Sequence, residues 1–182
     1  MTLASGQVVA VQGNIPSAYS YGAEVKVSMR LGFIRMPASL ISARYLIQDS
    51  KVRDPFTGEN RRLNSDRRYQ FDLSYRQDLR SLGASFGFSF KDTGVAGYST
   101  DLIGPNLLEQ FYAIEPTLEA FVEKRLAGST SLRIEVQNLS GVDERRSRFY
   151  RRYGTPNAPI LRTEGFTEHR ELRGAIRLRG SF

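Results

Sequence analysis

Apolar and polar residues alternate along most of this chain. In residues 171–182, apolar residues and glycine occupy the even positions, while Arg173, Arg177 and Arg179 occupy odd ones. Neighbouring side chains of a β-strand point to opposite faces, whereas these arginines would be spread around the axis of a helix. The period of two therefore predicts a strand with one apolar and one basic face.

The same split recurs through the chain and predicts about eight strands. It is clear in residues 21–30, 68–76, 82–91 and 132–137, and less regular in 38–50 and 112–125. Leu46 and Phe121 are apolar residues that fall on the polar faces of the two irregular segments. The first strand is expected near residues 6–13, where the alternation is weakest.

The connections between these strands are short on one side and long on the other. This asymmetry is typical of an up-and-down membrane barrel. We expect the two kinds of connection at opposite ends of the sheet, with Phe182 at the short-turn end. The long connections are 51–67, 92–111 and 141–164, and the short ones are 32–37, 79–81 and 127–129.

A soluble antiparallel sheet or sandwich also alternates, so it is the main alternative. Two features favour a membrane barrel. The expected strands run to about 10 residues, whereas soluble strands usually have about five or six. One face is charged, while the other carries aromatic residues such as Tyr69, Phe86 and Phe88. The predicted fold is all-β: an antiparallel up-and-down meander of about eight long strands, part of a transmembrane β-barrel.

Composition excludes several kinds of chemistry. Without cysteine the chain has no disulfide, thiolate metal site or cysteine nucleophile, and His169 is its only histidine. No Ser/His/Asp or acidic grouping has the spacing of a catalytic or calcium site. We therefore expect no enzyme activity, no catalytic residue, no metal and no cofactor. His169 is interpreted as a residue at the rim of the barrel mouth.

The chain is basic, with a formal net charge of +7 and a pI near 9.9. Nucleic acid is not the expected partner, because the arginines alternate singly and lie opposite the aromatic residues that could stack on bases. Mean hydropathy is −0.38 and no apolar run approaches a helical span. Transmembrane strands escape such measures because only every second residue faces lipid. The N-terminus lacks a basic segment followed by an apolar core, so we expect no signal peptide.

Three segments carry a resemblance to a known family. Phe182 closes an alternating strand, as in the C-terminal signal that the barrel assembly machinery reads in bacterial outer-membrane proteins, although Gly180 replaces a second aromatic residue. The segments Ser20-Tyr-Gly-Ala-Glu-Val and Leu132-Arg-Ile-Glu-Val-Gln-Asn-Leu resemble strands in the last third of TonB-dependent receptor barrels. Their order and spacing to the terminal Phe make the combination similar to that family.

The resemblance implies that residues 1–182 form one partial domain, roughly the last eight strands of a barrel of about 22. The plug domain and the N-terminal barrel strands have no counterpart here. The expected location is the outer membrane of a Gram-negative bacterium, in contact with lipid and lipopolysaccharide. The parent protein would take up a scarce nutrient, such as a ferric siderophore, and the TonB system would act on it through the plug.

Two groups of residues are candidates for function. Arginine with aromatic residues can hold a phosphate or a catecholate-like ligand through forked hydrogen bonds and cation–π contact. The first group, expected in a long outer loop, is Arg145, Arg146, Arg148, Tyr150, Arg151, Arg152 and Tyr153. It could equally contact lipopolysaccharide phosphates or form a charged mobile loop. The second, expected to line the lumen, is Arg133, Arg173, Arg177 and Arg179, with nearby acids as alternative partners.

Three other functional classes remain as alternatives. A complete eight-stranded barrel could serve as a structural anchor or adhesin. An outer-membrane protease or lipase would need Ser and Asp partners for His169 at the barrel mouth. The third alternative is a soluble nucleic-acid-binding sheet, which would stay in solution without detergent.

The alternation makes a prediction about the two faces of the C-terminal strand. Ile176→Arg or Leu178→Arg should impair assembly in membranes, because arginine at a lipid-facing midplane position costs about 2–4 kcal/mol. Arg177→Leu should be milder, since that side chain faces away from lipid. Heat-modified gel mobility of the membrane-inserted chain measures the outcome, and equal tolerance at positions 176 and 177 would contradict the assignment of faces.

Overall fold

The computed structural model describes residues 17–54, 58–64, 66–94, 97–152 and 158–180. Strands dominate this part of the chain, with two short 3-10 turns, η1 (Gly32–Ile34) and η2 (Arg80–Leu82). The strands are β1 (Ala18–Leu31), β2 (Met36–Arg53), β3 (Asn60–Arg61), β4 (Tyr69–Leu79), β5 (Ala84–Asp92), β6 (Gly97–Ile103), β7 (Asn106–Ile114), β8 (Thr117–Arg125), β9 (Ser131–Gln137), β10 (Asp143–Arg152), β11 (Ile160–His169) and β12 (Arg173–Arg179). Within the described ranges, no helix has the length and apolar character needed to cross a membrane.

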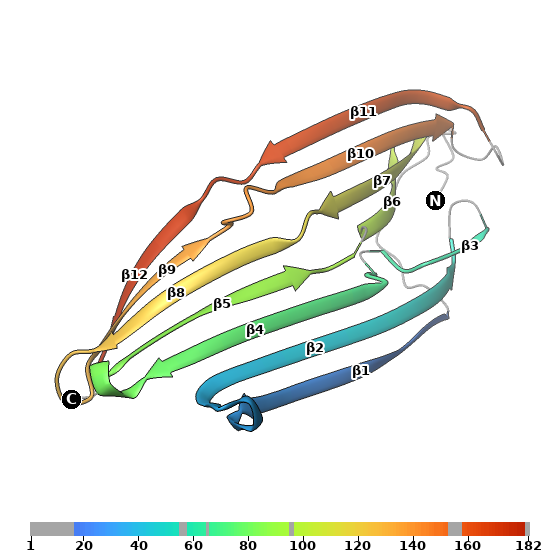
Figure 1. Cartoon of the computed structure of the whole chain (residues 1–182). Coiled ribbons are helices and arrows are strands. Elements are labelled where there is room, and N and C mark those ends of the chain that lie inside the picture. Colours follow the sequence, from blue (N-terminus) through green and yellow to red (C-terminus); the bar gives the residue numbers. More distant parts are fainter. Residues whose placement is uncertain (1–16, 55–57, 65, 95–96, 153–157, 181–182) are drawn as a thin grey trace.

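Antiparallel pairing joins the strands into two sheets. The larger sheet has the order β1-β2-β4-β5-β8-β9-β12, with β3 paired to β2, and the smaller has the order β11-β10-β7-β6. The strands of the smaller sheet continue the chain paths of the larger one, since β5 leads to β6, β7 to β8, β9 to β10 and β11 to β12. The predicted all-β, antiparallel, up-and-down architecture is confirmed (Figure 1).

The short turns lie together at one end of the larger sheet, as predicted. Each of these tight reversals contains a residue with positive φ: Arg35 (φ 64°), Gly83 (φ 57°) and Gly128 (φ 54°). The long connections lie at the opposite end (Figure 1). Phe182 lies outside the described residues, but Arg179 at the end of β12 pairs with Ser131, beside the turn between β8 and β9.

Two of the predicted long loops are in fact mainly strand. Residues 92–111 contain β6 and the start of β7, and residues 141–164 contain β10 and the start of β11. The loop prediction was wrong because it relied on alternation. In β10, Arg145 and Arg151 share one face while Arg146 and Arg148 share the other, so both faces are charged and no period-two contrast appears.

The two sheets meet where three chain paths are interrupted side by side. We call this the junction: Pro116, residues 138–142 and residues 170–172. Pro116 has no N–H to give to a ladder. Asn138 has a φ of 57°, its side-chain amide donates to the Arg170 carbonyl, and its Oδ1 accepts from Val142 N at 3.2 Å. Ser140 Oγ donates to the Pro116 carbonyl at 3.1 Å, so all three interruptions are hydrogen-bonded together.

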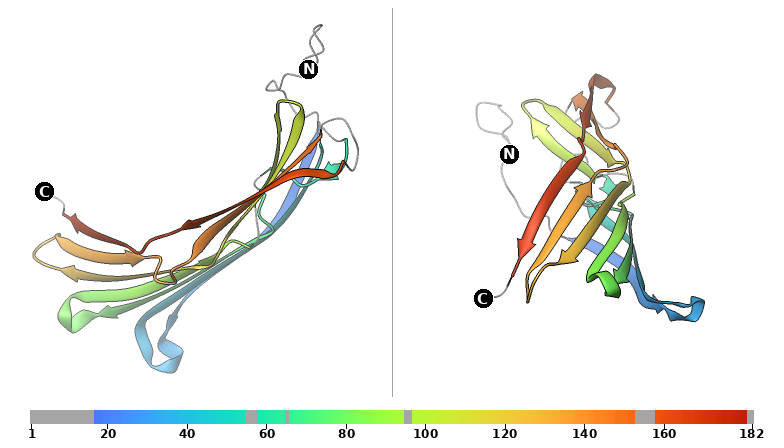
Figure 2. Two further views of the ribbon diagram at one scale, coloured as in Figure 1. Left: turned by 90° about the horizontal axis from the view of Figure 1, so that it is seen from above. Right: turned by 60° about the vertical axis from the view of Figure 1, so that its left-hand side comes forward.

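The larger sheet is curved, and β1 and β12 form its opposite edges (Figures 1 and 2). In the described part of the chain, β1 pairs only with β2 and β12 only with β9. The sheet therefore does not close on itself through these two strands. The first strand expected near residues 6–13 lies outside the described residues.

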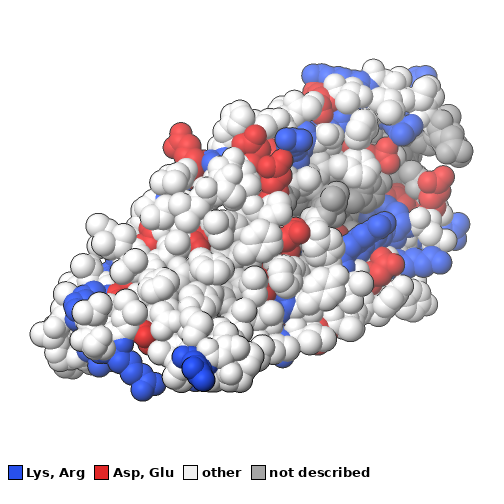
Figure 3. Space-filling view, in the orientation of Figure 1, with Lys and Arg blue, Asp and Glu red and all other residues white. Residues whose placement is uncertain are grey.

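The register aligns the apolar residues of all seven strands on one face. Val25 lies opposite Tyr45, Tyr45 opposite Phe71, and the alignment continues across the sheet to the pair Ile134 and Ile176. The apolar band, as we call this face, consists of Tyr21, Ala23, Val25, Val27, Met29, Ile41, Ala43, Tyr45, Ile47, Tyr69, Phe71, Leu73, Tyr75, Phe86, Phe88, Phe90, Leu118, Ala120, Val122, Leu132, Ile134, Val136, Gly174, Ile176 and Leu178. In the space-filling view, charged side chains gather mainly toward the two ends of this face (Figure 3).

The apolar band is exposed, and the charged face is the more enclosed of the two. Ile134 and Ile176 are 48% and 73% exposed, whereas Glu135 on the charged face is 6% exposed. This contrast is expected if the charged residues line the concave side of the curved sheet. The described part of the molecule thus has no conventional apolar core between layers.

The junction leads to a prediction about Asn138. Asn138→Ala should destabilise the fold by about 1–3 kcal/mol, because it leaves the Arg170 carbonyl without its amide donor and places a Cβ residue in the left-handed region. Asn138→Gly should cost less, since glycine keeps the backbone conformation and loses only the side-chain bonds. Urea unfolding in detergent gives the free energies, and hydrogen exchange of residues 138–142 locates the effect.

Leu139→Ala is the matched control, because Leu139 is 42% exposed and adjoins Asn138. If this change loosened the junction as much as Asn138→Ala, the amide of Asn138 would not be what holds the three interruptions together.

Candidate functional site

The charged face carries the most extensive set of polar contacts. Near β12, Glu135 of β9 is held by Arg177 at 2.6 Å and by Arg133 at 3.2 Å. Arg133 also lies 3.7 Å from Glu123, which lies 3.7 Å from Arg76. These pairs join β4, β8, β9 and β12 across the face. Glu135 keeps one arginine when the other is lost, which agrees with a mild effect of Arg177→Leu.

A second set of ion pairs ties the other end of the charged face. Arg44 of β2 lies between Glu24 of β1, with which it forms an ion pair, and Asp72 of β4 at 3.2 Å. Lys26 pairs with the same Glu24 at 2.8 Å. Cations and anions therefore alternate across neighbouring strands, so the face is compensated locally and does not form a uniform basic wall.

Phe121 interrupts the charged face and has a role that the alternation did not predict. The Arg133 guanidinium carbon lies 3.8 Å from the centre of the Phe121 ring, within cation–π range. Gly87 lies directly opposite Phe121, and a Cβ at Gly87 would come within 2.7 Å of the ring. Two apparent irregularities, an apolar residue and a glycine, thus form one packing unit that orients Arg133.

The four arginines expected to line a lumen share the charged face. Arg133 and Arg177 lie opposite each other in the register of β9 and β12. Arg173 and Arg179 lie on the same face of β12, opposite Gln137 and Ser131, and are exposed. Whether water or another part of a protein lies against this face stays a prediction.

The arginine cluster expected in an outer loop is not a single site. Its members from Arg145 to Arg152 lie on β10, a strand of the smaller sheet, and are divided between its two faces. On one face, Arg145 lies 3.1 Å from Glu115, and Arg151 Nε donates to Glu109 at 2.7 Å. On the other, Arg148 donates to Gln110 at 2.9 Å and lies above the Phe166 ring at 5.0 Å.

The remaining members of the cluster add little to a common binding surface. Arg146 lies 3.3 Å from Glu144, and the Tyr150 hydroxyl donates to Glu164 at 3.0 Å. Arg152 is exposed at the end of β10. Tyr153 lies outside the described residues. These residues are close in sequence, but the strand divides them between two faces. Five of them contact carboxylates: Arg145 with Glu115, Arg146 with Glu144, Arg151 with Glu109, and Arg148 and Tyr150 with Glu164.

A polar cluster adjoins the junction at the start of β10. Arg170 donates to Glu144 at 2.6 Å, and His169 Nδ1 lies 2.8 Å from Asp143. The Arg170 guanidinium holds the pKa of Glu144 below its usual value, partial burial opposes this shift, and Arg146 lowers the pKa further. The side chain of His169 is 81% exposed.

No group of three or more His, Asp or Glu residues in the described ranges is placed to hold a metal ion. The polar contacts instead pair acids with arginines. The arrangement forms an ion-paired surface on one side of a sheet whose other side is apolar.

Comparison with known proteins adds no relative. No protein-family model, curated protein or solved structure matches this chain.

The polar cluster predicts a local pH dependence. Because Arg170 stabilises the Glu144 carboxylate in the folded state, this contribution is present above the pKa of an unfolded glutamate, about 4.3. It is lost as the pH falls through the lower folded pKa. Carboxyl carbon NMR of Glu144 in micelles should show titration below the ordinary range, and Arg170→Gln should raise that pKa.

Arg146→Gln is the matched control. This substitution also removes one positive charge near Glu144, but Arg146 lowers the pKa of Glu144 less than Arg170 does. A larger rise in pKa from Arg146→Gln than from Arg170→Gln would contradict the assignment of Arg170 as the main partner.

Proposed function

We propose that this chain is a wall segment of an outer-membrane β-barrel, with the apolar band facing lipid and the charged face lining a watery interior. One observation carries the proposal: a continuous apolar face extends across seven strands and is open to solvent. Soluble monomers rarely leave contiguous apolar surface larger than a few hundred Å² uncovered. Lipid is the environment that such a face requires.

The dimensions of the apolar band agree with this role. On β1 the apolar face extends from Tyr21 to Met29, which is about 26 Å along the strand at roughly 3.3 Å per residue. Strands that span a membrane have about 9–11 residues and are tilted. Aromatic pairs lie within the band, including Tyr75 and Phe88 at 5.4 Å between ring centres. Aromatic residues are enriched in membrane-barrel surfaces near the interfaces.

The smaller sheet fits a position outside the membrane. Beyond the junction, β10 carries charged residues on both faces, with Arg145 and Arg151 on one and Arg146 and Arg148 on the other. A lipid-facing strand could not bear this, because charge at the midplane of the membrane is strongly unfavourable. In this arrangement the junction lies at the membrane surface, and β6, β7, β10 and β11 extend into water as long hairpins.

The parent protein is proposed to be a TonB-dependent receptor that takes up a scarce nutrient, with this chain forming its last barrel strands. Three features support this class. The larger sheet is wide, and among the described residues nothing pairs with the outer edge of β1 or of β12. These two strands run in the same direction, so direct closure would make a parallel pair, unlike the antiparallel pairs of up-and-down barrels. Asn138, in the Asn-Leu segment that resembles the family's penultimate strand, fastens the junction.

The absence of cysteine allows a direct test of the lipid-facing assignment. Single cysteines at Val27 and Phe88 on the apolar band, and at the adjacent Ser28 and Ser89 on the charged face, would be labelled with an environment-sensitive fluorophore in the full chain. In phosphatidylcholine vesicles, brominated acyl chains should quench the labels at Val27 and Phe88, and aqueous iodide should quench those at Ser28 and Ser89. Equal quenching within each adjacent pair would contradict a lipid-spanning sheet.

A further inference from the structure

The face of β2 that belongs to the apolar band becomes charged after Ile47. Tyr45 and Ile47 belong to the apolar band, and the next residues on the same face are Asp49 and Lys51. On β1, Tyr21 lies opposite Asp49 and Tyr19 lies opposite Lys51. The boundary between apolar and charged surface therefore runs directly beside exposed aromatic rings.

An apolar groove of about 970 Å³ ends at this boundary. Tyr21, Ala23, Tyr45, Ile47 and Tyr69 line it on β1, β2 and β4. Ile47 is 52% exposed and Tyr45 is 44% exposed, so the groove is open along the sheet face. The ring centres of Tyr45 and Tyr69 are 6.3 Å apart, which gives the groove an aromatic wall.

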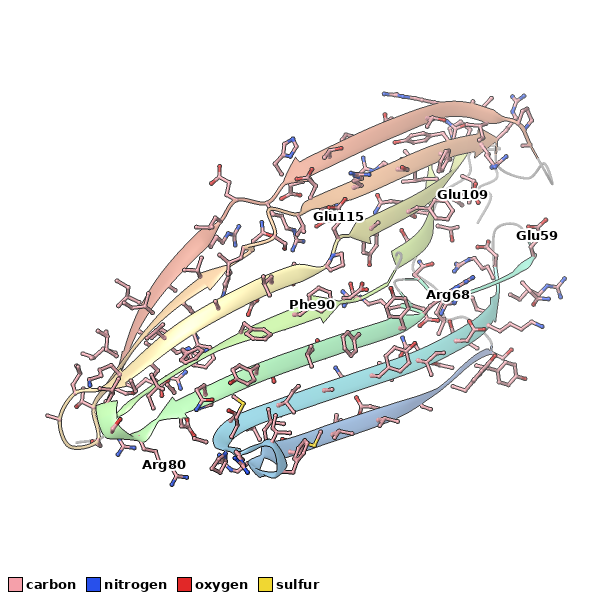
Figure 4. The ribbon with its side chains drawn as sticks, in the orientation of Figure 1. Glu59, Arg68, Arg80, Phe90, Glu109 and Glu115 are labelled. Atoms are coloured by element: carbon pink, nitrogen blue, oxygen red, sulfur yellow. The ribbon has the colours of Figure 1, made fainter. Side chains whose placement is uncertain are left out.

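A basic hollow of about 600 Å³ adjoins the groove. Lys51, Arg62 and Arg68 contribute its positive charge, and Tyr21, Asp49 and Arg68 line both spaces. Lysine and arginine gather at the corresponding end of the sheet face in the space-filling view (Figure 3). The Arg68 side chain lies there, beside the ends of β2 and β4 (Figure 4).

The charges of the hollow are not fully compensated. Asp49 is occupied by Arg62 at 2.8 Å, by the Ser50 N–H at 2.9 Å and by the Tyr21 hydroxyl at 3.4 Å. Lys51 and Arg68 are exposed, and among the described residues neither has a carboxylate partner. Two cations therefore remain available beside the open end of an apolar groove.

Arg62 and Ser50, which line the hollow, are held in place by hydrogen bonds. Asp66, whose side chain is 6% exposed, accepts from Arg62 at 3.1 Å and from the Gln48 side chain at 2.7 Å. Leu63 N donates to Ser50 Oγ at 3.0 Å, which fixes the segment that follows β3 against β2. The backbone and Arg62 beside the hollow are thus held in place, whereas the Lys51 and Arg68 side chains are exposed.

We propose that the groove and the hollow together bind one phosphate-bearing lipid whose head group carries a net negative charge. One acyl chain lies in the groove against Tyr45 and Ile47, and the phosphate lies between Lys51 and Arg68. A neutral lipid would leave the two cations unused, and a free anion would leave the groove unused. This inference rests on the proposed function, because the site faces lipid only if the apolar band does.

The test uses the full chain with a single reporter cysteine at Ala43, which lies on the apolar band two residues from Tyr45 and outside the groove. The labelled protein is placed in phosphatidylcholine vesicles that contain either brominated phosphatidic acid or brominated phosphatidylcholine. Half-maximal quenching should need about tenfold less of the phosphatidic acid, because each basic residue near a membrane surface adds to the attraction of anionic lipid.

Three variants make the result specific. The double variant K51S/R68S should abolish the preference, whereas K51R/R68K should keep it, which separates loss of charge from loss of folding. The matched control R35S/R80S removes two exposed arginines from the short-turn end and should leave the preference unchanged. A preference that persists in K51S/R68S, or that disappears equally in R35S/R80S, would overturn the site.

The remaining outcomes distinguish the two proposals. Quenching by both brominated lipids to the same degree would leave the lipid-facing sheet in place and overturn the lipid site. No quenching by either lipid would overturn the proposed function itself. Titration with inorganic phosphate in phosphatidylcholine vesicles covers the free anion: binding as tight as that of phosphatidic acid would assign the hollow to free phosphate and overturn the lipid site.

Discussion

The register of the antiparallel ladder is the constraint on which the rest of this structure depends. Side chains alternate along a strand, so a slip of one residue would move every apolar side chain of that strand to the charged face. The register from β1 to β12 keeps seven apolar stripes side by side. The register that places Ile134 opposite Ile176 on the apolar band also brings Glu135, Arg133 and Arg177 together on the charged face.

The charged face explains how a chain with a net charge of +7 avoids concentrated repulsion. Its arginines lie between carboxylates on neighbouring strands, as Arg44 lies between Glu24 and Asp72. Surface ion pairs contribute little individually, so their main effect here is to fix side-chain positions and keep the face hydrophilic. Phe121 and Gly87 extend this ordering by supporting Arg133 with an aromatic ring.

The junction separates two regions under different constraints. On the side of the larger sheet, the strands carry one apolar and one charged face. In the smaller sheet, β7, β10 and β11 carry polar residues on both faces. Ion pairs between these strands, such as Arg151 with Glu109, hold the hairpins together. In the proposed membrane location, the alternation of apolar and charged faces ends where the lipid ends. The proposed lipid site lies at the same kind of boundary, where Ile47 gives way to Asp49 and Lys51.

The sequence by itself determined the strands of the larger sheet and the assignment of their faces. A period of two is a local property, so residues such as Ile176 and Arg177 could be placed on opposite faces without knowledge of their neighbours. Short turns were equally local, because Gly83 and Gly128 mark tight reversals. The strand β10 was missed, since charged residues on both of its faces give no periodic contrast. The strand β6 was missed because its sequence, with Leu102 and Ile103 adjacent, does not alternate either.

Only the tertiary structure decided which residues act together. Arg145 and Arg151 are separated from Arg146 and Arg148 by the two faces of β10, although all four are close in sequence. Arg68, Lys51 and Tyr21 are far apart in sequence and come together because β1, β2 and β4 pair in register. Sequence spacing fixes which face a side chain occupies, but contacts between strands depend on register and on long-range pairing, which no local pattern encodes.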